Sequence, residues 1–174
     1  DIIVTYRNLR HRNKQQDYTL GIYVDVLTQA TLMPVLIIPY PDEEGFQGLL
    51  SKLSNVLIIS DHVQGDFHLV DSALPFSGGE GVLRLAHIED KVVYDRYMGE
   101  INKIPDIPTT HAKEAILTML LKEPVDYIKS CAEILKEKLP SLKVEYDVKL
   151  GHCLEETKKL VQDHDIGLVV ANTK

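Results

Sequence analysis

Three polar side chains follow an apolar run in this sequence: Ser60, Asp61 and His62 come directly after residues 56–59. A carboxylate and an imidazole can bind a ribose, a base or a cation. Parallel α/β sheets bind ligands at the carboxyl ends of their strands, which is where Ser60, Asp61 and His62 would lie. A turn that leaves a strand also needs small polar residues. The spacing alone therefore leaves two interpretations open, a ligand site and a polar turn.

The histidines do not form a pattern that predicts a metal site. His62 and His68 are separated by five residues and His152 precedes Cys153, but neither spacing is that of a zinc motif. His87 closes an apolar run, where a buried, hydrogen-bonded imidazole is a simpler interpretation than catalysis. We therefore expect no metal ion.

Two further groups of residues also fail to predict an active site. Glu145 and Asp147 share one strand face by period two, but no acid–base partner can be identified. The segment 77–81, SGGEG, is rich in glycine, yet it precedes a strand rather than a helix and so predicts a turn. We expect no catalytic residue.

Composition narrows the function classes. Hydrophobic residues make up 44 % of the 174 residues and charged residues 26 %, which is typical of a globular protein. A net charge of -7 disfavours a nucleic-acid partner. No apolar run is long enough for direct membrane insertion, and no signal peptide is found. The two cysteines form no CxxC motif, which favours a reducing, cytoplasmic compartment. Because the chain begins without Met, we expect a piece of a longer protein.

Strands and helices alternate along the predicted structure. Apolar runs predict strands over 1–6, 33–39, 55–60, 81–88, 141–150 and 166–173. Helical spacing predicts helices over 17–31, 66–74, 109–122, 124–139 and 153–164, with Pro75 and Pro124 as helix boundaries. Residues 91–108 show little pattern and are expected to be a connection. The alternation predicts an α/β protein with a doubly wound, Rossmann-like parallel sheet in three α/β/α layers.

The motifs resemble the universal stress protein family in its tandem form. IISDH resembles the turn after the family's first strand, RLAHI its second strand, and KLGHCLEE the start of its third helix. DIIVTYR and GLVVANT both resemble its fourth strand, and LGIYVDVLTQATLMPVLII its last helix and strand. The resemblance implies three segments. Residues 1–40 are the closing part of a first unit, 41–54 a linker, and 55–174 a second unit without its last helix and strand.

The resemblance also implies an adenine-nucleotide site, for ATP or AMP. Family members that bind ATP use the aspartate after strand one, which is Asp61 here between Ser60 and His62. They use backbone groups after strand two, which implies His87 and Ile88, and a glycine-rich loop after strand four. That loop would begin near Asn172 in the second copy, and only Gly21 of it remains in the first copy, where Ile22 replaces the hydroxyl residue. The implied site lacks its phosphate cradle.

Three functions remain open. The first is a non-enzymatic binding or signalling module of the universal-stress-protein type, with a degraded nucleotide site. The second is a cytoplasmic regulatory domain of a larger protein such as a membrane transporter. The third is an enzyme of the adenine-nucleotide α-hydrolase-like class. The resemblance further implies a homodimer through residues 35–38. We expect the strand at 34–39 to join the sheet of residues 56–59 or to pair with its copy in a second chain.

Overall fold

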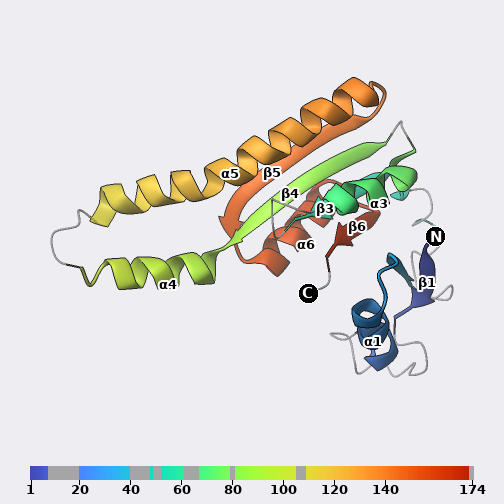
Figure 1. Ribbon diagram of the computed structural model, residues 1–174, viewed down its shortest axis with the longest axis horizontal. Helices are drawn as coiled ribbons and strands as arrows, with labels where there is room; N and C mark the ends of the chain where they lie inside the picture. The colour runs from blue at the N-terminus through green and yellow to red at the C-terminus, as the bar shows by residue number, and fades with distance from the viewer. Residues whose placement is uncertain are drawn as a thin grey trace. The chain divides into compact units, whose positions relative to one another are not determined.

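The computed structural model describes residues 1–7, 20–39, 48, 52–60, 67–78, 81–104 and 109–172. The chain divides into two compact units, with the boundary between Ser51 and Lys52. Each unit contains its own parallel sheet (Figure 1). The units are therefore described separately.

The first unit is a short strand–helix–strand segment. β1 (Ile3–Tyr6) and β2 (Val35–Ile38) form a parallel pair, and α1 (Ile22–Ala30) lies between them in the chain. Val24 is the buried residue of α1. Gly21 precedes the helix at φ 92, a backbone angle that side chains with a Cβ rarely adopt. This glycine therefore allows the chain to turn sharply into α1.

The second unit contains a four-stranded parallel sheet with the order β5-β4-β3-β6. Its strands are β3 (Asn55–Ile59), β4 (Val82–Asp90), β5 (Lys143–Gly151) and β6 (Leu168–Ala171). The chain moves outward from β3 through β4 to β5 and then returns to place β6 on the other side of β3. The predicted α/β class and the parallel, Rossmann-like sheet are confirmed.

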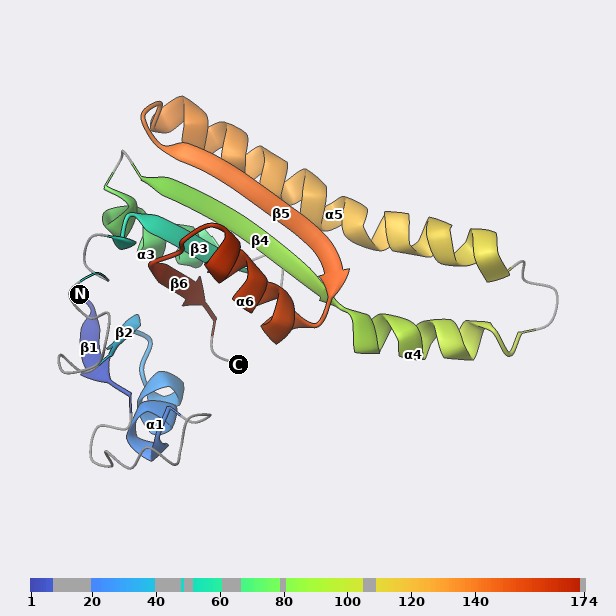
Figure 2. The same cartoon turned by 180° about the vertical axis from the view of Figure 1, so that it is seen from behind.

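Helices cover both faces of this sheet. α3 (Phe67–Ser77) and α5 (Thr109–Lys138) pack on one face, where Leu69, Ala73, Ile128 and Leu135 join the strand residues in the larger core. α6 (Cys153–Asp163) packs on the other face through Leu160 (Figure 2). The central strand β3 reads as a continuous apolar run because both of its faces are covered in this way, whereas the edge strand β5 alternates apolar and charged residues.

Residues 91–108 were expected to be a connection, and this expectation is wrong for α4 (Lys91–Ile101). The Asp90 side chain accepts a hydrogen bond from the Val92 backbone N–H at 2.8 Å and caps the helix. Lys91 and Asp95 form an i,i+4 ion pair. Met98 is the helix's buried residue. The helix was missed because a single buried side chain gives almost no apolar periodicity.

Two proline residues were expected to mark helix boundaries, Pro75 an end and Pro124 a start, and neither does. α5 continues through Pro124 for 30 residues, and α3 continues through Pro75 to Ser77. An interior proline costs about 3 kcal/mol, so the packing of the surrounding helix must offset that cost. α3 ends instead at Gly78, which has a φ of 62.

The predicted neighbour of residues 34–39 is also corrected in part. β2 pairs with β1, and both edges of β3 are occupied, by β4 and β6. Direct pairing of residues 34–39 with residues 56–59 is therefore excluded, and joining that sheet at another strand stays a prediction. Pairing of β2 with a second copy stays a prediction.

Candidate functional site

The carboxyl end of β3 brings together three of the residues singled out in the sequence. Ile59 pairs with Ala86 on one side and with Ala171 on the other. The next residue of each strand therefore lies at the same edge of the sheet, which places Ser60 between His87 and Asn172. The Ser60 backbone N–H donates to the Ala86 carbonyl at 3.0 Å, and this bond fixes the end of the strand.

His87 is a buried group of this edge, with 4 % of its surface exposed. Its Nδ1 lies 2.9 Å from the Ser60 carbonyl oxygen. Because a carbonyl oxygen can only accept, Nδ1 carries the proton of this hydrogen bond. Nε2 lies 3.4 Å from an Oε2 atom of Glu89, a long contact. The imidazole therefore holds the Ser60 carbonyl in place, as expected of a satisfied buried histidine.

The remaining candidates are distributed differently. The side chain of Ile88 packs on the opposite face from His87, in the cluster with Leu57 and Leu160. Gly21 belongs to the first unit. Asp61 and His62 lie outside the described residues. Asn172 is exposed at the end of β6.

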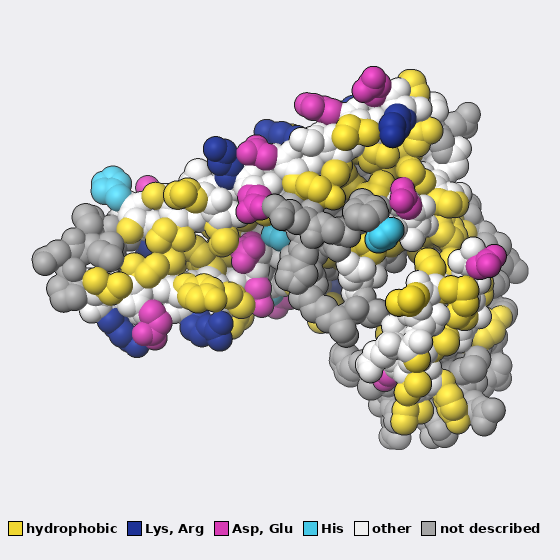
Figure 3. Space-filling model, in the orientation of Figure 1, with side chains coloured by type: hydrophobic (Ala, Val, Ile, Leu, Met, Phe, Trp, Pro, Cys, Tyr) yellow, Lys and Arg dark blue, Asp and Glu magenta, His cyan; other side chains and the backbone are white. Residues whose placement is uncertain are grey.

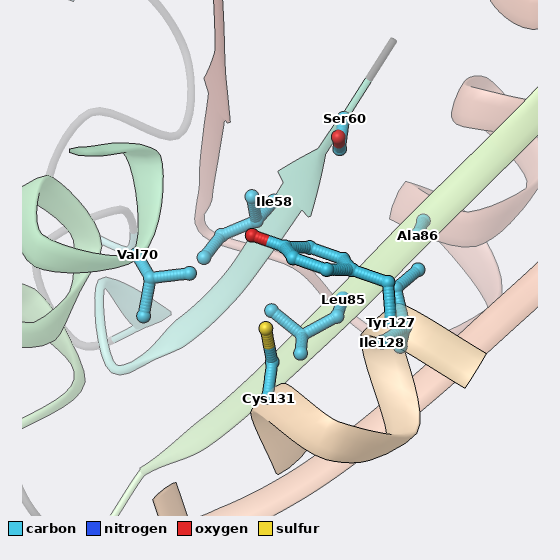
Figure 4. A pocket seen from close by; sticks show the side chains of 8 residues that line it. All are labelled: Ile58, Ser60, Val70, Leu85, Ala86, Tyr127, Ile128 and Cys131. Carbon is cyan, nitrogen blue, oxygen red and sulfur yellow. The ribbon is translucent and has the colours of Figure 1, made fainter. Parts of the chain in front are cut away.

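A small cavity lies next to this edge, between the sheet and the helices α3 and α5. Its volume is about 20 Å³, enough for about one water molecule. Figure 4 shows the Tyr127 ring reaching from α5 across Leu85 toward Ile58, with Ser60 at one end of the group and Cys131 on the same helix. A nucleoside is too large for this space, and the cavity itself therefore cannot hold one.

A second group of polar residues lies near the start of the strands, on the face that α6 partly covers. Arg84 of β4 is 7 % exposed and donates to Glu145 and, at 2.5 Å, to Asp147 of the neighbouring strand β5. It also lies 3.1 Å from Nδ1 of His164. Since arginine can only donate, this Nδ1 is the acceptor and carries no proton.

Arg84, Glu145 and Asp147 form an ion cluster rather than an open binding site. A cavity of about 320 Å³ lies beside it, lined by Val82, Arg84, Lys143, Glu145, His164 and Ile166. The cations Arg84 and Lys143 are already paired with the two carboxylates. The Lys143 hydrogen bond holds the pKa of Glu145 below its ordinary value; partial burial opposes this effect and the Arg84 charge adds to it. An incoming anion would have to displace these carboxylates.

The sequence contained a partial signal for this cluster. Glu145 and Asp147 were recognised as sharing a strand face, and a lone arginine interrupts the apolar run of β4. The pairing of β4 with β5, which places Arg84 opposite Glu145, was the missing information.

Two kinds of feature are absent from the parts of the chain that the structure describes. There, no three His, Cys, Asp or Glu side chains come together as metal ligands. None of the helices in those parts has the length and apolar character needed to cross a bilayer.

Comparison with known proteins adds no assignment. No protein-family model, no curated protein and no solved structure matches this chain.

Proposed function

We propose that this chain is a non-enzymatic binding module of the universal-stress-protein type, built on a doubly wound sheet. The strand order of the second unit is the observation that supports this most. Counted in chain order within that unit, β5-β4-β3-β6 is 3-2-1-4, the order of a doubly wound fold up to its fourth strand. The direction of winding reverses at β3, and ligands of such folds bind in the crevice at that point.

The proposed ligand is an adenosine-like molecule, such as AMP or ATP, bound at the ends of β3 and β6. Asp61 follows Ser60 directly in the chain and would offer its carboxylate to the ribose or the base. His87, which follows the pairing position Ala86 of β4, and Asn172, which follows β6, border the same edge. His87 is a positioning residue in this proposal, because it acts through the Ser60 carbonyl.

The phosphate groups of the nucleotide would add little to its binding affinity for this chain. A phosphate cradle needs successive glycine residues whose backbone N–H groups point at the anion from a helix N-terminus. The segment before α1 retains Gly21 alone, followed by Ile22. Affinity should therefore depend on the nucleoside and be nearly the same for AMP, ADP and ATP.

Calorimetry with AMP, ADP and ATP on the wild type and on Asp61→Ala tests the proposal. We expect weak binding of all three with similar affinity, and loss of binding in Asp61→Ala. Asp71→Ala is the matched control, because it removes an exposed carboxylate of α3. Tight ATP binding that survives Asp61→Ala would refute the site, and a steep gain from AMP to ATP would refute the missing cradle. If none of the three binds, Ser60, Asp61 and His62 form a polar turn.

A second candidate function is a regulatory domain of a larger protein such as a membrane transporter. The helices α4 and α5 favour it, because the first half of α5, residues 111–123, contains no buried residue and extends beyond the sheet core (Figure 1). A regulatory domain needs such a surface for a partner. Transmembrane segments in the full-length gene would favour this candidate.

A further inference from the structure

His87 and Glu89 form a pair of titratable groups at the edge where the ligand is proposed to bind. β4 continues past Ala86, the partner of the last β3 residue Ile59, so residues 87–90 lie beyond the end of β3. The His87 side chain is 6 % exposed and the Glu89 side chain 23 % exposed. Acidic side chains gather near the junction of β4 with α4 in the space-filling view (Figure 3). The proposed site therefore has a buried imidazole and a half-buried carboxylate at its border.

Both ring nitrogens of His87 face oxygen atoms that accept hydrogen bonds. Nδ1 lies 2.9 Å from the Ser60 carbonyl oxygen, and Nε2 lies 3.4 Å from Oε2 of Glu89. A neutral imidazole has a single N–H, which the Ser60 carbonyl takes, so Nε2 would then turn its lone pair toward the carboxylate. Both contacts are favourable only when the His87–Glu89 pair holds one further proton. Because an imidazole is ordinarily a stronger base than a carboxylate, this proton belongs on Nε2.

The elements packed beside the ring present apolar groups, a phenol and a thiol to this edge. β5 places Val148 opposite His87, and α5 brings Tyr127 and Cys131 to the small cavity next to it. The charged or titratable residues of α3 and of the adjoining turns of α5 are exposed: His68, Asp71, Lys122, Glu123, Asp126 and Lys129.

The junction of β4 with α4 uses its own charges locally. The Asp90 carboxylate caps α4, and Lys91 pairs with Asp95. The carboxylate and the imidazole of residues 61 and 62 lie outside the described residues. In the part of the chain that the structure describes, Glu89 is therefore the carboxylate that contacts the ring.

We propose that Glu89 is a positioning residue that holds His87 as an imidazolium, and that this ion pair makes the proposed ligand edge sensitive to pH. A charged imidazole holds the Ser60 carbonyl more strongly than a neutral one does. Loss of the proton at higher pH leaves the carboxylate facing a lone pair, weakens the hold on Ser60 and adds one negative charge beside the edge. An anionic ligand such as AMP would then bind more weakly. The effect on AMP rests on the proposed function, whereas the charge of His87 does not.

Nuclear magnetic resonance of the nitrogen-labelled full chain tests the charge of His87, because the shift of a ring nitrogen shows whether it carries a proton. The signals lost in His87→Gln identify the residue. We expect both ring nitrogens to be protonated in the wild type at about pH 7. In Glu89→Gln the amide can donate to Nε2, so the ring should be neutral with its proton on Nδ1 alone. Asp71→Asn, which removes an exposed carboxylate of α3, is the matched control and should leave both nitrogens protonated.

Calorimetry with AMP from about pH 6 to about pH 8.5 tests the coupling to the ligand edge. The wild type and Glu89→Gln should bind AMP equally at the lower pH, and the wild type about threefold more weakly at the higher pH. The titration of the phosphate group is common to both proteins and cancels in this comparison. Equal affinities at both ends of the range would overturn the coupling.

The charge of His87 is decided without AMP. An unprotonated Nε2 in the wild type at about pH 7, or a doubly protonated ring in Glu89→Gln, would overturn the proposal. If Glu89→Gln does not fold, as judged by circular dichroism, the wild-type spectrum alone decides. If AMP does not bind at all, the proposed function fails, and the protonation of His87 still confirms or overturns its pairing with Glu89.

Discussion

Arg84 is the buried cation whose loss should have the largest effect on the second unit. Its side chain is 9 % exposed, whereas Glu145 and Asp147 are 28 % and 29 % exposed. Removing one partner of a fully buried ion pair costs about 3–5 kcal/mol. The partial exposure of both carboxylates, and the second ion pair of Glu145 with Lys143, lower this cost. We expect Arg84→Met, which keeps an apolar stem in place, to lower the free energy of unfolding by about 2–3 kcal/mol.

Urea denaturation followed by far-ultraviolet circular dichroism measures this change, and an unaltered slope would show that the denatured state is unaffected. The triple variant Arg84→Met, Glu145→Gln, Asp147→Asn also removes both carboxylate charges. It should recover most of the lost free energy of unfolding, because no unpaired carboxylate charge then remains in the cluster. Lys52→Met is the control: it removes an exposed pair with Asp165 and should cost less than about 1 kcal/mol. A single variant within about 0.5 kcal/mol of the wild type would refute the argument that the burial of Arg84 determines its energetic weight.

Two further outcomes follow from the geometry of the second unit. Gly81→Ala should lower the free energy of unfolding by about 2–3 kcal/mol, because the added Cβ would lie 2.2 Å from the Ser54 carbonyl oxygen. Gly99→Ala in α4 should instead raise it by about 0.5–1 kcal/mol in the same urea assay, because nothing lies within 4 Å of the added Cβ. The Lys143 hydrogen bond is the main reason that the folded-state pKa of Glu145 lies below its ordinary value. The ionised Glu145 therefore stabilises the folded state at any pH above its unfolded-state pKa, and this contribution is lost as the pH falls through the folded-state pKa. The stability advantage of wild type over Glu145→Gln should therefore be full at pH 7 and shrink below the ordinary glutamate range; an advantage that stays constant down to pH 3 would contradict this.

The elements buried on both faces were the ones that the sequence predicted best. β3 and β4 lie in the centre of the sheet, and their apolar runs read as strands without any knowledge of their neighbours. The helix α6 was equally clear, because one face packs through Leu160 while the rest is charged. Burial on a defined face leaves a local pattern in the sequence.

The predictions that were wrong or missing concern elements that depend on contacts between residues far apart in the sequence, which leave no local pattern. α4 has one buried residue and is fixed largely by its cap at Asp90. Continuation of α5 through Pro124 depends on packing further along the helix, at Ile128 and Leu135. Arg84 meets Glu145 across 61 positions of sequence, so their pairing requires the register of β4 with β5.

α5 carries Tyr127 beside Ser60 at the proposed nucleotide site, and residues 111–123 of the same helix extend beyond the sheet core. Pro124 lies between them, and its missing N–H removes the hydrogen bond that would tie it to the Leu120 carbonyl. The helix is therefore weakest between residues 111–123 and the half that packs on the sheet. The sheet-bound half, in contrast, is anchored by Ile128 and Leu135 in the core. A partner that binds residues 111–123 consequently has no rigid route to the strand ends, and coupling between that surface and the nucleotide site would require the core around Tyr127 to shift as well.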